Sequence, residues 1–106
     1  MAWLYLGIAG VFEVVWAFAM KQSQGFAQLG WGAFAVVTML ASFGFLALAM
    51  RALPLGTAYT IWTGIGAVGA FALGVLVLGE STSPLRLVAA GLIVSGLVLM
   101  RLSAAE

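Results

Sequence analysis

The stretch GVFEVVWAFAMK, residues 10–21, combines a strongly apolar run with a single carboxylate. Glu13 is the only charged side chain between Met1 and Met20. A run of roughly 20 mostly apolar residues is long enough to cross the hydrocarbon core of a bilayer as a helix. We therefore predict a membrane-spanning helix over about residues 2–20, with one ionisable side chain inside it.

The composition of the whole chain is typical of an integral membrane protein. Of its 106 residues, 65% are hydrophobic and only 7% carry a charge. A soluble domain of this length could not cover so much apolar surface with polar atoms. The absence of Cys and His removes the commonest metal ligands and the commonest acid–base group. The net charge of +1 argues against nucleic-acid binding, so we expect no metal, no cofactor and no nucleic-acid partner.

Three further segments reach or approach the length of a membrane span. They lie at about residues 30–50, 56–79 and 85–102. The last is short, so Arg86 and Arg101 at its ends must extend toward the lipid headgroups. The connections are short, which favours antiparallel neighbours. We predict a single all-α transmembrane domain of four helices over residues 1–106.

The breaks between the spans contain residues that end or begin helices. Pro54 favours an end to the second helix before it. In GESTSP, residues 79–84, Gly79 is expected as a C-cap and Ser83 as an N-cap. Pro84 suits the first position of the fourth helix.

The basic residues give no preferred orientation in the membrane. Lys21 and Arg86 fall on one side of the predicted spans. Arg51 and Arg101 fall on the other side. Because cytoplasmic loops normally carry the excess of Lys and Arg, this chain is expected to insert either way up. Two oppositely inserted copies could then pair as an antiparallel homodimer, which would supply the inverted repeat that larger transporters encode in one chain.

Glu13 is expected to face a cavity or the interior of the helix assembly, because a charged group in contact with lipid is costly. Its neighbours one helical turn away include the small Gly10 and the large Trp16. We expect no buried Lys, Arg or His to pair with it, because the basic residues fall at the edges of the spans. We interpret Glu13 as a group that takes up a proton or a cation. The alternative is a structural hydrogen bond between helices.

The second and third helices offer polar and aromatic side chains that could meet Glu13. In GTAYTIWTGIGAVGA, residues 56–70, Tyr59 and Trp62 are one turn apart. Ser42 provides a hydroxyl in the second helix. Simple packing of the aromatic rings, and a bond from Ser42 to its own helix backbone, are the alternatives.

The fourth helix lacks a comparable polar face. Gly91 and Gly96, with the adjacent alanines, form a smooth surface of the kind found where helices contact one another in membranes. We predict that this helix forms the contact between two copies.

Three stretches of the chain together resemble the small multidrug resistance family. They are GVFEVVWAFAMKQSQGF at 10–26, RALPLGTAYTIWTGIGAVGA at 51–70 and GESTSPLRLVAAGLIVSGLVLM at 79–100. Within the family the chain is more similar to the guanidinium exporters than to the exporters of quaternary ammonium drugs, since Trp16 follows Glu13 by one turn. Thr60, where Ala is commoner, is a minor departure.

The resemblance implies a proton-coupled antiporter that exports guanidinium or small guanidinyl cations. It implies a multi-pass protein of the bacterial inner membrane, active as an antiparallel homodimer within the lipid bilayer, with protons as the coupling ion and no enzymatic activity. The family's central carboxylate corresponds to Glu13. Its substrate pocket corresponds to Gly10, Trp16, Ser42, Tyr59 and Trp62.

Side-chain chemistry agrees with a guanidinium substrate. Guanidinium is a planar cation with only N–H donors, and a carboxylate such as Glu13 can accept two of them in parallel. The hydroxyls of Ser42 and Tyr59 could accept further hydrogen bonds or orient the carboxylate. The indoles of Trp16 and Trp62 could stack on the cation. Three other functions stay open: export of quaternary ammonium ions, a non-transporting membrane assembly protein, and an ion channel lined by Glu13.

Overall fold

The structure is a computed structural model that describes residues 1–103 and consists of four α-helices. The helices are α1 (Ala2–Gln22), α2 (Leu29–Ala49), α3 (Leu55–Leu76) and α4 (Pro84–Ser103). Each is long and apolar enough to cross a membrane, so the chain is a multi-pass membrane protein. Residues 104–106, which the predicted domain included, lie outside the described residues.

The loop between α3 and α4 differs in part from the prediction. Helix α3 ends at Leu76, not near residue 79, and the predicted role of Gly79 as its C-cap is wrong. Gly79 lies in the loop with a φ of +71°, a conformation that glycine adopts without strain. The prediction for α4 is confirmed, because the helix begins at Pro84 and the Ser83 hydroxyl accepts the Arg86 backbone N–H at 3.3 Å.

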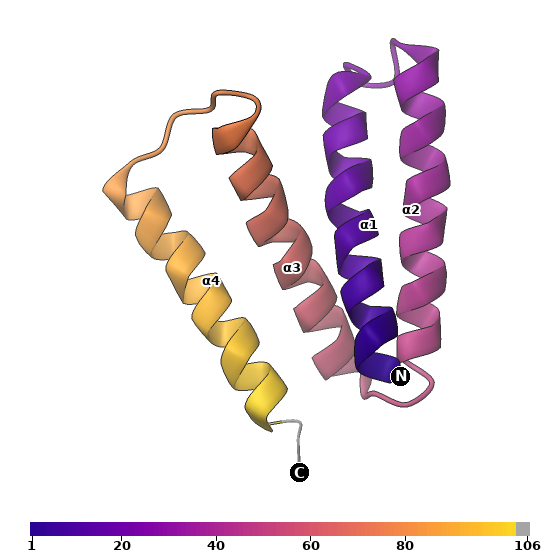
Figure 1. The fold of residues 1–106 in the computed structure, drawn as a ribbon, viewed down its shortest axis with the longest axis vertical. Helices are drawn as coiled ribbons and strands as arrows, with labels where there is room; N and C mark the ends of the chain where they lie inside the picture. Colours follow the sequence, from indigo (N-terminus) through magenta and orange to yellow (C-terminus); the bar gives the residue numbers. More distant parts are fainter. Residues whose placement is uncertain (104–106) are drawn as a thin grey trace.

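The helices run alternately up and down, and they form one open layer (Figure 1). Helix α1 packs against both α2 and α3, whereas α4 packs mainly against α3. Helix α4 also contacts α1 where the Arg101 guanidinium lies 4.3 Å from the centroid of the Trp3 ring. The layer measures 45 × 35 × 16 Å. A helix with its side chains is about 10–12 Å across, so residues 1–103 form a layer little more than one helix thick that encloses no central channel of its own.

Glycines allow α1 and α3 to approach each other closely. A Cβ added at Gly10 would lie 2.6 Å from Ile65 Cγ2 of α3. The roles are reversed at Gly69 of α3, where an added Cβ would overlap Val14 of α1. Small residues are the usual means by which helices make close contact in a membrane. The two helices therefore interlock along the segment that carries Glu13.

The face of α4 that carries Gly91 and Gly96 remains uncovered. No residue of this helix is buried, and a Cβ at Gly91 or Gly96 would meet nothing within 4 Å. The predicted surface is thus present and accessible. Contact with a second copy through it stays a prediction.

We predict that Gly69→Ala loosens the α1–α3 contact, while Gly44→Ala does not. Both substitutions place alanine in the middle of a helix, so the gain in helix propensity is similar. At Gly69 the new methyl would overlap the stiff, β-branched Val14, whereas at Gly44 it would meet nothing within 4 Å. Because overpacking costs about 1–3 kcal/mol, Gly69→Ala should be less stable than Gly44→Ala by that amount. Unfolding in mixed micelles, followed by circular dichroism, measures the difference, and equal stabilities would contradict this packing.

Candidate functional site

The centre of the site is a hydrogen-bonded pair on α1. The indole Nε1 of Trp16 donates to Glu13 Oε1 at 2.6 Å. The two residues are three positions apart, so the helix places both on one face. The carboxylate is half-buried. Since the indole engages one oxygen, the second oxygen and the remaining lone pairs can accept hydrogen bonds from another donor.

Helix α3 provides the surface on which Glu13 lies. A Cβ placed on Gly66 would overlap Glu13 Cγ, so only glycine leaves room for the side chain at this position. Gly66 is buried. Gly66 follows Trp62 by four residues and so shares its helix face, but its contact with the Glu13 side chain becomes visible only once the two helices are docked.

One helical turn from Glu13, a second set of hydrogen bonds joins three helices. Trp62 Nε1 of α3 donates to Ser42 Oγ of α2 at 2.9 Å. The Ser42 hydroxyl in turn donates to the backbone carbonyl of Ala9 in α1 at 2.7 Å. Both Ser42 and Trp62 are buried. A buried donor without an acceptor is costly, so this chain of bonds determines how the three helices align.

Aromatic rings surround the Trp62 indole. The ring of Tyr59 lies 5.5 Å from it at an interplanar angle of 50°, and the ring of Phe43 lies 5.7 Å from it at 66°. Such tilted and edge-on arrangements are the favoured ones for aromatic pairs. Tyr59 is 52% exposed, so this aromatic group extends from the interior of the layer to its surface.

The predicted pocket residues therefore separate into two groups. Glu13 and Trp16 are in contact with each other, and Gly10 is packed against α3. Ser42, Tyr59 and Trp62 form the second group.

The expected action of Ser42 on the carboxylate is not what the structure shows. Its single donor is used by Ala9, and it does not bond its own helix as the alternative had it. Tyr59 precedes Gly66 by seven residues, which is about 10 Å along α3. Neither hydroxyl touches Glu13 within this chain.

Two participants were missed from the sequence. Phe43 packs edge-on against Trp62, and only its position next to Ser42 could have suggested this. The carbonyl of Ala9 accepts the Ser42 proton. A backbone acceptor leaves no signal in a sequence, because every residue has one.

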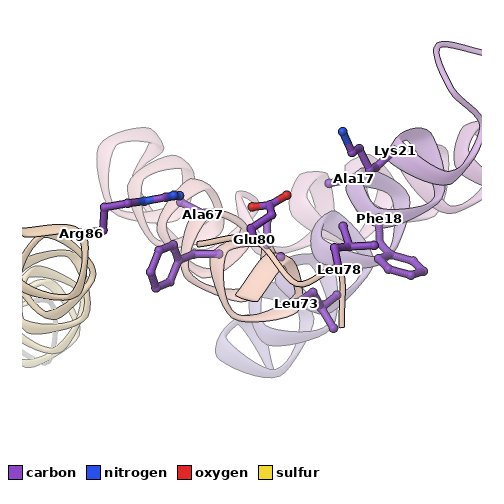
Figure 2. A pocket seen from close by; sticks show the side chains of 11 residues that line it. Ala17, Phe18, Lys21, Ala67, Leu73, Leu78, Glu80 and Arg86 are labelled. Carbon is purple, nitrogen blue, oxygen red and sulfur yellow. The ribbon is translucent and has the colours of Figure 1, made fainter. Parts of the chain in front are cut away.

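A cavity of about 340 Å³ opens between α1 and α3, toward the end of the layer that holds Lys21. It begins at Ala17, one turn beyond Glu13 on α1, and it is also lined by Glu80 and Arg86 (Figure 2). Its walls include both apolar and charged side chains.

The chemistry of the site is that of a cation acceptor. Within residues 1–103 there is no group of three His, Cys, Asp or Glu side chains that could hold a metal ion. The site offers a carboxylate with one oxygen already positioned and aromatic faces. Those groups suit a small organic cation that carries N–H donors.

Comparison with known proteins agrees with this architecture. A family model described as Small Multidrug Resistance protein matches residues 1–93. A protein of Citrobacter freundii named guanidinium exporter is 52% identical over 103 residues, which cover 97% of this chain and 98% of that protein. The guanidinium exporter of Escherichia coli K12 is 50% identical over 103 residues, with the same coverage of 97% and 98%. The chain therefore belongs to the small multidrug resistance family.

Proposed function

We propose that this protein exports guanidinium or small guanidinyl cations in exchange for protons. The observation that carries the proposal is the Trp16–Glu13 hydrogen bond inside a membrane-spanning helix. It combines the carboxylate and the aromatic face that a planar cation needs. The relatives that are 50–52% identical over nearly the whole chain, and that are named guanidinium exporters, support the same substrate class.

Substrate binding would centre on the Glu13 carboxylate. A guanidinium ion can donate two parallel N–H bonds to it while one face of the cation stacks on the Trp16 indole. The indole N–H holds Oε1 and so restricts the carboxylate to few orientations. Bulky rings at Trp16 and Trp62 favour a small, flat cation over a broad one.

Proton coupling would follow from competition for this one carboxylate. A proton and a cation cannot occupy it together, and the only basic residue of α1, Lys21, lies eight residues away at the end of the helix. Release of the cation on one side of the membrane is then favoured when a proton arrives there. The opposite exchange on the other side resets the carrier, with no cofactor and no enzymatic step.

The functional unit of the proposal is an antiparallel homodimer in the bacterial inner membrane. A layer 16 Å thick cannot surround a substrate, and α4 presents a face without buried residues. Basic residues are divided evenly, with Lys21 and Arg86 at one end of the layer and Arg51 and Arg101 at the other. The even division allows insertion in both orientations.

We predict that Glu13→Gln abolishes proton-coupled guanidinium exchange. The substitution keeps the shape of the side chain but removes its charge. Loss of two charge-assisted hydrogen bonds at about 1.5–3 kcal/mol each should weaken substrate binding by roughly a hundredfold or more. Liposomes loaded with guanidinium, with the external pH recorded, measure the exchange.

In the unmodified protein, protonation of Glu13 should compete with the substrate. Apparent affinity for guanidinium should therefore fall as the pH falls, by up to about tenfold per unit. Coupled exchange in Glu13→Gln, or a binding constant that is independent of pH, would rule out this mechanism. Uptake of tetraethylammonium without guanidinium transport would instead favour the quaternary ammonium function.

A comparison of Trp16→Phe with Trp16→Gly should separate the two roles of the indole. Phenylalanine keeps an aromatic face but loses the N–H that holds Glu13, whereas glycine loses both. We expect Trp16→Gly to bind guanidinium more weakly by about two- to thirtyfold, from a cation–π contribution of about 0.5–2 kcal/mol. Bulkier ammonium ions should gain relative to guanidinium. Competition transport assays measure the preference for guanidinium over ammonium ions. Unchanged selectivity in Trp16→Gly would show that the indole only packs and does not select the substrate.

Dual insertion can be tested by adding charge to one end of the layer. Gln24→Lys with Gln28→Lys places two cations in the loop between α1 and α2, which should hold that loop in the cytoplasm. We expect export to fall strongly. It should return on co-expression with a chain carrying Ala52→Lys and Ser103→Lys at the opposite end. Gln24→Glu with Gln28→Glu is the matched control, since acidic residues hardly affect orientation. Full activity of the Lys variant alone would exclude the antiparallel unit.

A further inference from the structure

We propose that the mouth of the cavity between α1 and α3 contains a second, weaker site for a guanidinium ion, formed by Glu80 and Phe71. In this structure the guanidinium group of Arg86 occupies its edge. The inference rests on the proposed function, because it assigns a waiting position to the same substrate. Nothing in the mechanism above uses these three residues.

The first observation is the position of Arg86. Its guanidinium carbon lies 5.3 Å from the centroid of the Phe71 ring, within the range of a cation–π contact. Nη1 donates to the backbone carbonyl of Ser81 at 2.9 Å. The chain thus holds a guanidinium group, the same chemical class as the proposed substrate, over an aromatic face that lines the cavity. This location is compatible with a guanidinium ion in size, charge and hydrogen bonding.

The second observation is the position of Glu80. Its carboxylate lines the same cavity and lies against Gly74, where an added Cβ would overlap Glu80 Oε1. Figure 2 shows the carboxylate between the Arg86 side chain, which comes from α4, and Lys21, which comes from α1. The C-terminal end of α3 carries the negative end of the helix dipole, so the Glu80 carboxylate adds to the negative potential there. The dipole and the carboxylate together attract a cation to this end of the cavity.

The third observation is continuity with the central site. Glu13, Ala17 and Lys21 are spaced by four residues, so they follow one face of α1. Ala17 and Lys21 both line the cavity. Eight residues of helix correspond to about 12 Å, so a cation at the mouth would be roughly two helical turns from Glu13. The cavity extends from the end of the layer that holds Lys21 to Ala17, one helical turn from Glu13.

The charges at the mouth make this site weak. Lys21 and Arg86 together outweigh the single negative charge of Glu80, and all three side chains are exposed. A substrate ion must displace Arg86 from Phe71 to bind. Weak binding suits a position from which the ion moves on, because a tight outer site would retain the substrate before it reached Glu13.

The test uses Glu13→Gln protein in detergent, in which the central carboxylate is removed. Guanidinium chloride labelled with ¹⁵N is titrated at constant ionic strength, and binding is measured from the line width of the free ion. We expect saturable, weak binding that falls by up to about fivefold when Glu80→Gln is added, the upper size expected for loss of one exposed ion pair. Adding Arg86→Gln instead should strengthen binding by about two- to fivefold.

Lys21→Gln in the Glu13→Gln background is the matched control. It removes one positive charge from the same cavity without freeing the Phe71 ring. Its increase in guanidinium affinity should therefore be smaller than that of Arg86→Gln. Equal gains would show that only net charge matters and would overturn the role of Arg86. Absence of saturable binding in Glu13→Gln, or binding unaffected by Glu80→Gln, would overturn the site itself. The proposed function fails separately, if the unmodified protein does not exchange guanidinium in liposomes.

Discussion

The close approach of α1 and α3 is the constraint on which the rest of the structure depends. Gly66 leaves the space in which the Glu13 side chain lies, and Gly10 accepts Ile65 from the opposite helix. Each helix thus contributes a glycine where the other contributes a side chain. In a membrane, such packing replaces the hydrophobic driving force that holds soluble helices together. The carboxylate is consequently held against protein rather than lipid, which makes a charged group tolerable there.

Polar groups within the layer are matched in a small number of hydrogen bonds, and this organises the site. Trp62 and Ser42 satisfy each other and the Ala9 carbonyl. Their bonds fix the helices on either side of α1. Glu13 is held differently, by a neutral donor on its own helix. The only basic residue of the same helix, Lys21, is eight residues away, so the structure gives the Glu13 carboxylate no ion-pair partner among the described residues. If Glu13 had only a structural role as part of an ion pair, a Lys or Arg would be expected beside it.

The flatness of the layer connects the fold with assembly. A single chain buries little of its apolar surface, and no residue of α4 is buried. Lipid can cover an apolar face at no cost, but it could not solvate the cation that the proposed function places at Glu13. A second copy, placed over the face that exposes Tyr59, would complete an enclosure that one layer of helices cannot form. The even distribution of basic residues makes either orientation of that copy accessible.

The amino-acid sequence by itself determined the class of this protein and predicted where its chemistry lies. Four apolar runs of helical length require membrane-spanning helices, because a bilayer leaves no other way to satisfy the backbone of such segments. Glu13 was identified since a lone charge is conspicuous in an apolar run, and Trp16 because the helical repeat places it one turn away. Pro84 and Ser83 correctly located the start of α4, since capping is a local property.

Only the tertiary structure decided which groups meet across helices. Periodicity placed Tyr59, Trp62 and Gly66 on one face of α3, yet Gly66 contacts Glu13 while Tyr59 is largely exposed. Ser42 was expected beside the carboxylate, but it bonds Ala9. Helix spacing gives the angular position of a side chain, whereas the partner across an interface depends on the axial shift and tilt between helices. Those quantities result from the packing of many side chains together, and no single stretch of sequence contains them.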